Sequence, residues 1–183
     1  MSETAQSPEQ VQFIRKLRQH RQFTDQPVPD DVLQDLLEVA RWTGSSKNTQ
    51  PWELVVVRDR QLIDQIAEYG AFSGFLRNAP VVIVIVLNGK SPRSESYDEG
   101  RLTERVMLAA KAYGLGSGTG WWGDAEAARK TKEALGIPQE KDVISGIALG
   151  YPPAPQPGPA GVAPGRKPLA EIVHYDRYGN QGS

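Results

Sequence analysis

The stretch Ala79-Pro-Val-Val-Ile-Val-Ile-Val-Leu87 carries the clearest structural signal in this sequence. Every residue from Val81 to Val86 is β-branched, which is typical of a strand. The run is apolar at successive positions instead of alternating with polar residues, so both faces of the strand need a covering layer. We therefore predict that 79–87 forms a buried, central strand of a sheet.

Helices and further strands are predicted on both sides of this strand. Apolar residues at helical spacing indicate long helices at 10–21, 60–69, 101–113 and 124–135, another from Asp30 to about 42–44, and one or two helical turns at 71–78. Strands are predicted at 53–57, 143–149 and 169–175. Asp30 and Asp31 should supply an N-cap and a negative first turn, Asp124 a second cap, and Gly70 and Gly136 two helix ends.

Three polar or Pro-rich stretches are predicted to lie outside the helices and strands. Residues 1–9 read as a polar tail, 88–99 as a mobile surface loop, and 151–168 as an extended Pro/Gly-rich arm. Two helices come first and the strands are few, which favours an α+β fold with a small mixed central sheet flanked by helices. A chain of 183 residues fits a single domain.

Composition narrows the range of functions. The chain has 21 basic and 22 acidic residues and a net charge of −1, without a run of like charge, so neither a nucleic acid nor a membrane is the expected partner. It has no cysteine and two histidines, which cannot alone furnish a metal site. It lacks a secretory signal, and no apolar run approaches the length of a membrane span. We expect a cytoplasmic protein that binds small molecules or a second copy of itself.

Two polar segments lie where binding chemistry is plausible. The first is Arg18-Gln19-His20-Arg21-Gln22-Phe23, in which Arg18 and Arg21 would share a helical face and could converge on one phosphate or carboxylate. The alternative is a solvated basic face. The second is Ser45-Ser-Lys-Asn-Thr-Gln-Pro-Trp52, whose Asn48 and Gln50 amides both donate and accept, as the edge of a pyrimidine-like ring requires. The alternative is an ordinary loop.

Two further segments add to these. Gly114–Gly123 is Gly-rich, but a dinucleotide-binding fingerprint must follow a strand, and a helix precedes this one. Its glycines would instead let backbone N–H groups approach a flat ligand, while Trp121 and Trp122 either wall a pocket or fill the core. Arg166 and Lys167, at the end of the Pro-rich arm, could complete an anion site or remain solvated.

The order of these motifs along the chain resembles that of the nitroreductase-like flavoproteins. The resemblance comprises Arg-x-x-Arg-x-Phe, Ser-x-x-Asn-x-Gln-Pro-Trp, Gly-Leu-Gly-Ser-Gly, Leu149-Gly-Tyr-Pro152 and Arg-Lys-Pro-Leu, and it runs from about Phe13 to Tyr175. It implies an intertwined homodimer with FMN at the subunit interface and NADH or NADPH as the electron donor. Where many relatives have two arginines and a serine, this chain has Leu17, Arg18 and Gln19, and Gly44 stands where a proline is frequent.

The resemblance also implies which residues hold FMN. Arg18 and Arg21, joined by Arg166 or Lys167, would hold the phosphate, and the Ser45 segment would contact the flavin, in relatives often that of the opposite subunit. The full set of implied cofactor contacts is Arg18, Gln19, His20, Arg21, Ser45, Ser46, Asn48, Gln50, Ser117, Gly118, Thr119, Gly120, Arg166 and Lys167.

The expected chemistry is that of the cofactor. Hydride would pass from NAD(P)H through flavin N5 to a nitroaromatic or quinone in a ping-pong cycle, with no catalytic side chain and no metal. Lys47 is a candidate for stabilising negative charge on the ring, or it is a solvated loop residue. The alternatives are a dehydrogenation or dehalogenation on the same scaffold, for which 88–99 could cover the pocket, and a non-catalytic flavin-binding sensor or carrier.

Overall fold

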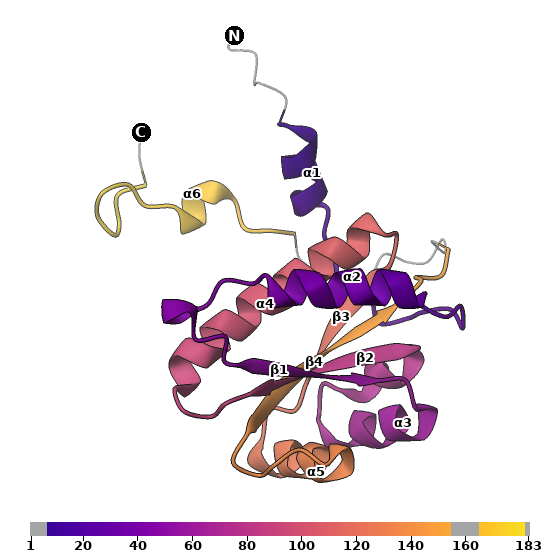
Figure 1. Ribbon diagram of the computed structural model, residues 1–183. Helices are drawn as coiled ribbons and strands as arrows, with labels where there is room; N and C mark the ends of the chain where they lie inside the picture. Colours follow the sequence, from indigo (N-terminus) through magenta and orange to yellow (C-terminus); the bar gives the residue numbers. More distant parts are fainter. Residues whose placement is uncertain (1–6, 155–164, 182–183) are drawn as a thin grey trace. The chain divides into compact units, whose positions relative to one another are not determined.

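A computed structural model describes residues 7–154 and 165–181, and the chain divides into two compact units, Met1–Pro153 and Ala154–Ser183 (Figure 1). The first unit contains the sheet and its covering helices. Among the described residues, no helix has both the length and the apolar character needed to cross a membrane.

The sheet has four strands in the order β1 (Trp52–Val57), β2 (Val81–Leu87), β4 (Asp142–Gly150) and β3 (Gly116–Trp121). β2 is central, as predicted, with Val84 opposite Val55 of β1 and Gly146 of β4. The predicted mixed sheet needs correction, because all three pairings are antiparallel. The sequence could not show strand direction, since a run that is buried on both faces has the same pattern in either case.

The two faces of β2 explain its uninterrupted apolar sequence. Its odd-numbered residues pack in a cluster with α2 (Asp30–Arg41) and α4 (Pro92–Ala112), and its even-numbered residues pack with α3 (Arg60–Tyr69), η2 (Gly74–Asn78) and α5 (Ala125–Leu135). Figure 1 shows these helices in layers on opposite sides of the sheet. The predicted helices at 60–69 and 124–135 and the turns at 71–78 are confirmed, as are the Asp124 cap and the ends at Gly70 and Gly136.

The predicted surface loop at 88–99 is wrong, because α4 begins at Pro92 and includes the rest of this stretch. Proline is favourable at the first helical position, where its missing N–H costs nothing. Glu95 then folds back, and its carboxylate accepts hydrogen bonds from the N–H groups of Gly89, Lys90 and Ser91 at 2.8, 3.1 and 2.9 Å. The acidic residues that suggested a solvated loop are therefore buried parts of the structure.

The first helix is shorter than predicted. α1 spans Glu9–Arg15, and after a turn at Lys16 the chain to Thr24 has no regular secondary structure. The helix does not continue because backbone N–H groups beyond it bond to other segments. The N–H of His20 donates to Ser117 O at 2.7 Å, and the N–H of Thr24 donates to Tyr151 O at 2.8 Å. Arg18 and Arg21 consequently do not share a helical face.

Two smaller predictions also need correction. Pro29, and not an aspartate, is the N-cap residue of α2, and it makes no side-chain cap; Asp30 and Asp31 supply only the negative first turn. In the second unit the predicted strand at 169–175 is absent, and α6 (Leu169–Ile172) is a single helical turn. Because apolar residues occupy most positions there, the pattern fits both the helical and the strand periodicity and could not distinguish a helix from a strand. Part of the predicted arm, 155–164, lies outside the described residues.

Candidate functional site

The first and third sequence-predicted segments lie together at the edge of the sheet. Besides the bond from His20 to Ser117, the Thr119 N–H donates to the Gln19 side-chain carbonyl at 3.3 Å. A Cβ on Gly118 would collide with the backbone oxygen of His20, and one on Gly116 would meet the His20 ring. These two glycines are therefore needed for the close approach of residues 19–20 to β3, and contact of this segment with a flat ligand stays a prediction.

Positive charge gathers beside this contact without acidic partners. The Arg18 guanidinium donates only to the backbone oxygens of Arg15 and Leu17, at 2.9 and 2.7 Å, and Arg21 lies over the Phe75 ring at 5.6 Å. Neither arginine forms an ion pair with an acid within 7–154 or 165–181. This end of the protein therefore has free cationic donors for an anion.

Lys111 of α4 belongs to the same positive region. Its ammonium donates to Phe13 O at 2.5 Å and lies 4.5 Å from the centre of the Phe13 ring. Desolvation lowers the pKa of Lys111, and the positive charges of Lys16 and Arg18 lower it further. Repulsion among these cations would be relieved by a bound anion. Sequence reasoning missed Lys111, because its proximity to Phe13 arises only from the tertiary fold.

The Ser45 loop (45–51) is a strained turn between α2 and β1, and part of it is the short 3-10 helix η1 (Ser46–Asn48). Lys47, Asn48 and Gln50 have φ angles of 52°, 56° and 47°, in the left-handed region that non-glycine residues seldom occupy. The Gln50 N–H donates to Ser45 Oγ at 2.8 Å, and the Gln50 amide donates to Asn48 Oδ1 at 3.3 Å. Such strain, about 1 kcal/mol or more per residue, commonly marks ligand-binding sites.

Asp98 holds this loop in place from α4. Its carboxylate accepts a hydrogen bond from the Ser46 N–H at 3.0 Å and lies 3.4 Å from Arg101 Nη1, with only 2% of its side chain exposed. Sequence reasoning missed Asp98, because 88–99 was interpreted as a loop. The pair Ser91-Pro92, typical of a helix start, was the available signal.

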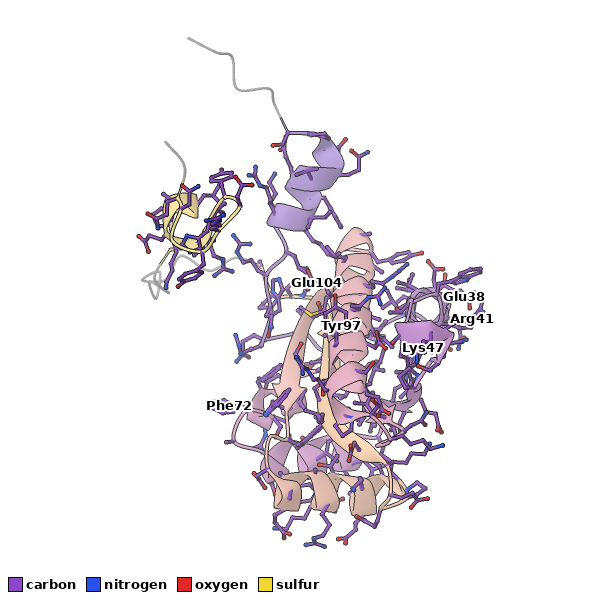
Figure 2. The ribbon with its side chains drawn as sticks, turned by 90° about the vertical axis from the view of Figure 1, so that its left-hand side faces the viewer. Glu38, Arg41, Lys47, Phe72, Tyr97 and Glu104 are labelled. Carbon is purple, nitrogen blue, oxygen red and sulfur yellow. The ribbon has the colours of Figure 1, made fainter. Side chains whose placement is uncertain are left out.

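A pocket of about 650 Å³ opens between the Ser45 loop and the first turns of α4. Figure 2 shows Lys47 near the end of α2 and Tyr97 on α4. The residues that line the pocket are Ser45, Ser46, Ser91, Arg93, Ser94, Tyr97, Asp98 and Arg101. Its volume falls within the range of about 300–1,000 Å³ that is typical of small-molecule sites.

Arg166, Lys167 and the two tryptophans are the remaining residues singled out in the sequence. Arg166 and Lys167 are exposed and belong to the second unit, so their predicted place beside Arg18 stays a prediction. Trp122 is buried, and its indole N–H donates to Ile66 O at 2.8 Å, which makes it a core residue, whereas Trp121 is 46% exposed. Within the described ranges, no hydrogen bond or ion pair joins the Arg18–Arg21 segment to the Ser45 loop.

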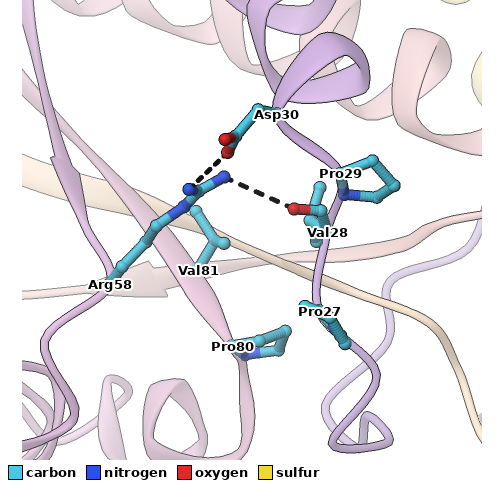
Figure 3. A pocket seen from close by; sticks show the side chains of 7 residues that line it. All are labelled: Pro27, Val28, Pro29, Asp30, Arg58, Pro80 and Val81. Atoms are coloured by element: carbon cyan, nitrogen blue, oxygen red, sulfur yellow. Dashed lines mark hydrogen bonds and ion pairs between the residues drawn. The ribbon is translucent and has the colours of Figure 1, made fainter.

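A second pocket, of about 320 Å³, contains none of the predicted residues (Figure 3). Pro27, Val28, Pro29, Asp30, Arg58, Pro80 and Val81 line it. Arg58 is fully engaged there, because it pairs with Asp30 at 2.5 Å and donates to Val28 O at 3.4 Å. These contacts fix the start of α2 to the end of β1, so the charges of this pocket serve the fold.

Comparison with known proteins agrees with this arrangement. The profile of the nitroreductase family matches residues 14–71 and 69–151, which is most of the chain. The chain belongs to the nitroreductase family. The matched residues include the Arg18–Arg21 segment, the Ser45 loop, the glycine-rich strand β3 and Asp98, so the two groups described above lie inside the region that defines the family.

Alignments with individual relatives extend over most of this chain and most of each relative. A protein of Archaeoglobus fulgidus, whose proposed activity is that of an NADH dehydrogenase or NAD(P)H nitroreductase, is 32% identical over 78% of this chain and 84% of its own. The NADPH-flavin oxidoreductase of Vibrio harveyi is 24% identical over 92% of this chain and 74% of its own. The solved FMN-dependent nitroreductase of Clostridium difficile superposes with a TM-score of 0.77 at 24% identity, covering 92% of this chain and 99% of that one, which supports the fold.

Proposed function

We propose that this protein is an FMN-dependent NAD(P)H oxidoreductase that reduces a small acceptor such as a nitroaromatic or a quinone. The observation that carries the proposal is the strained Ser45 loop, whose Lys47, Asn48 and Gln50 are held in left-handed conformations and are exposed. Residues in such conformations persist only where the surrounding structure holds them, and they are concentrated at active sites and ligand-binding sites. Family membership and the relatives named for flavin and nicotinamide chemistry support the same conclusion.

The donor set of the chain fits FMN. Arg18 and Arg21 would hold the phosphate, because both guanidinium groups lack acidic partners within the described ranges. The amides of Asn48 and Gln50 would pair with the pyrimidine edge of the ring, which alternates donors and acceptors. Gln19, His20, Ser46 and the segment 117–120 would complete the contacts, with Ser45 setting the loop conformation through Gln50.

FMN, when bound, would supply the chemistry of hydride transfer from NADH or NADPH at N5 and of two-electron reduction of the acceptor. The chain's own residues would bind FMN, orient it and place charged groups beside it. Lys47 would place a cation near the ring and stabilise the negative charge of its reduced form. No side chain would be required as a general acid or base, and the nicotinamide and the acceptor would bind in turn in a ping-pong cycle.

The active form would be a homodimer in the cytoplasm. In the described part of one copy, no hydrogen bond or ion pair joins the Arg18 segment to the Ser45 loop, and the flavin would lie between the Arg18 segment of one copy and the Ser45 loop of the other. Exposed apolar side chains on α1, Val11 at 41% and Ile14 at 53%, offer surface for such an interface. Arg166 and Lys167 would reach the phosphate on the arm that precedes α6.

The first experiment tests flavin chemistry directly. The purified protein should be yellow or should become so with FMN, and anaerobic mixing with NADPH or NADH should bleach the flavin absorbance within seconds. A protein that never binds FMN would contradict the proposal. Bound flavin that stays oxidised with both nicotinamides would favour a sensor or carrier, and reduction by an organic substrate instead of a nicotinamide would favour a dehydrogenase or dehalogenase.

The phosphate assignment has its own test. The double change Arg18→Ala, Arg21→Ala should weaken FMN affinity about a hundredfold or more, since each of the two charge-assisted hydrogen bonds contributes about 1.5–3 kcal/mol. Fluorescence titration with FMN measures the effect. Arg60→Ala, Arg129→Ala is the matched control, because it removes two exposed arginines from α3 and α5. Equal affinities in the two double variants would show that the phosphate binds elsewhere.

A further inference from the structure

We propose that the pocket between the Ser45 loop and α4 selects aromatic acceptors that carry an anionic group, such as a carboxylate or a sulfonate. This inference rests on the proposed function, because it names the substrate class of the same site. The pocket adjoins the loop whose amides would contact the flavin, since Ser45 and Ser46 belong both to that loop and to the pocket wall. A volume of about 650 Å³ accommodates a substituted ring.

The charged groups of the pocket wall leave an excess of positive charge. Its one acid, Asp98, is already satisfied by the Ser46 N–H at 3.0 Å and by Arg101 Nη1 at 3.4 Å. Arg93 is exposed and makes neither a hydrogen bond nor an ion pair with any residue in the described ranges. One free guanidinium therefore faces a pocket in which no carboxylate remains to attract a cationic ligand.

Arg101 lies beside Gly44 in the pocket wall. A Cβ at residue 44 would lie 2.9 Å from Arg101 Nη2, so the guanidinium lies close against the backbone of the residue that precedes the Ser45 loop. Arg101 Nη1 faces Asp98, whereas Nη2 has no acidic partner among residues 7–154 and 165–181. Arg101 therefore adds an N–H donor to the wall beside the Ser45 loop, while Arg93 supplies the unpaired charge.

Tyr97 supplies the aromatic surface. Its side chain is 73% exposed on α4 and lines the pocket (Figure 2). An exposed tyrosine can stack on a flat ring, with centroids about 4.5–7 Å apart. Ser91 and Ser94 add hydroxyl groups to the same wall. A ring stacked on Tyr97 with an anionic substituent directed at Arg93 and Arg101 uses each of these features.

The test compares two ligands of nearly the same shape, 4-nitrobenzoate and 4-nitrobenzamide. Calorimetric titration of the purified protein in 0.15 M salt, without nicotinamide, measures binding alone. We expect 4-nitrobenzoate to bind the unaltered protein several-fold more tightly than the neutral amide. Arg93→Gln should weaken binding of the benzoate about fivefold, as loss of a partly exposed ion pair predicts, and leave binding of the amide unchanged. Tyr97→Leu should weaken both.

Arg105→Gln is the matched control, since it removes another exposed arginine of α4 that does not line the pocket. Equal binding of the two ligands by the unaltered protein, or equal loss in Arg93→Gln and Arg105→Gln, would overturn the proposal. Its failure can be distinguished from failure of the proposed function. If NADPH bleaches the flavin but the protein does not discriminate between the two ligands, only the proposal of a selective pocket is refuted. Discrimination that depends on Arg93 in a protein whose flavin stays oxidised refutes only the reductase.

Discussion

At the scale of single residues, Glu99 shows how a buried acid is tolerated beside the sheet. It is 5% exposed, and its carboxylate accepts a hydrogen bond from Ser145 Oγ at 2.6 Å. Burial raises the pKa of Glu99, and the hydrogen bond from Ser145 offsets only part of that rise. A carboxyl group whose pKa is higher in the folded protein binds more protons there than in the unfolded chain.

This difference predicts a pH dependence of stability. As pH rises from the ordinary glutamate pKa through the raised one, the proton on Glu99 is lost and its contribution to the free energy of unfolding falls. Glu99→Gln should abolish this contribution and leave the protein at least as stable at pH 7.5, because the neutral amide can still accept from Ser145. Urea unfolding between pH 4.5 and 8 measures the slope. Glu104→Gln, on the exposed side of α4, should retain the dependence of the unaltered protein; an unchanged slope in Glu99→Gln would contradict the prediction.

At the scale of elements, the start of α4 depends on one side chain. Glu95 is 4% exposed and satisfies three backbone N–H groups of residues 89–91. Glu95→Ala would leave these donors without their partner, so we expect the free energy of unfolding to fall by about 3 kcal/mol. Glu104→Ala, on the same helix but exposed, should change it by less than about 0.5 kcal/mol. Denaturant unfolding of both variants compares them, and equal stabilities would show that Glu95 is dispensable.

Elements with local signals could be predicted from the sequence, whereas those fixed by distant contacts could not. The predictions of β2 and α5 were correct because their signals are local. β-branched residues favour the strand, and the Asp124 cap and the left-handed Gly136 mark the two ends of the helix. β3 was not predicted as a strand, because glycine is unfavourable there until residues 19–20 approach it closely. The start of α4 was missed because its acids are buried by tertiary contacts.

The candidate site shows the same division. The polar character of the Ser45 loop was visible in the sequence, and its proximity to α4 was not, because Asp98 and Ser46 are 52 residues apart. The contact between Gln19 and Thr119 likewise joins segments 100 residues apart. The order of motifs indicated the family, whereas the positions of Arg93 and Arg101 in one pocket required the fold.

At the scale of the whole molecule, α1 is difficult to explain in an isolated copy. It has seven residues and no buried side chain, and Val11 and Ile14 are exposed. Isolated helices of this length are marginal in water, so packing must supply what the short helix lacks. In the proposed homodimer the second copy would cover these side chains and bring its Ser45 loop or its Arg18 segment to the shared flavin.

The dimer proposal predicts that assembly and flavin binding are lost together. Ile14→Asp places a charge on the apolar side of α1 and should convert the protein from dimer to monomer at micromolar concentration, as measured by sedimentation equilibrium. The monomer should hold FMN much more weakly, because each complete site would need two copies. Gln12→Asp, which adds the same charge on the opposite side of α1, is the control and should remain dimeric with its flavin. A monomeric Ile14→Asp that binds FMN as tightly as the unaltered protein would show that one copy contains the whole site.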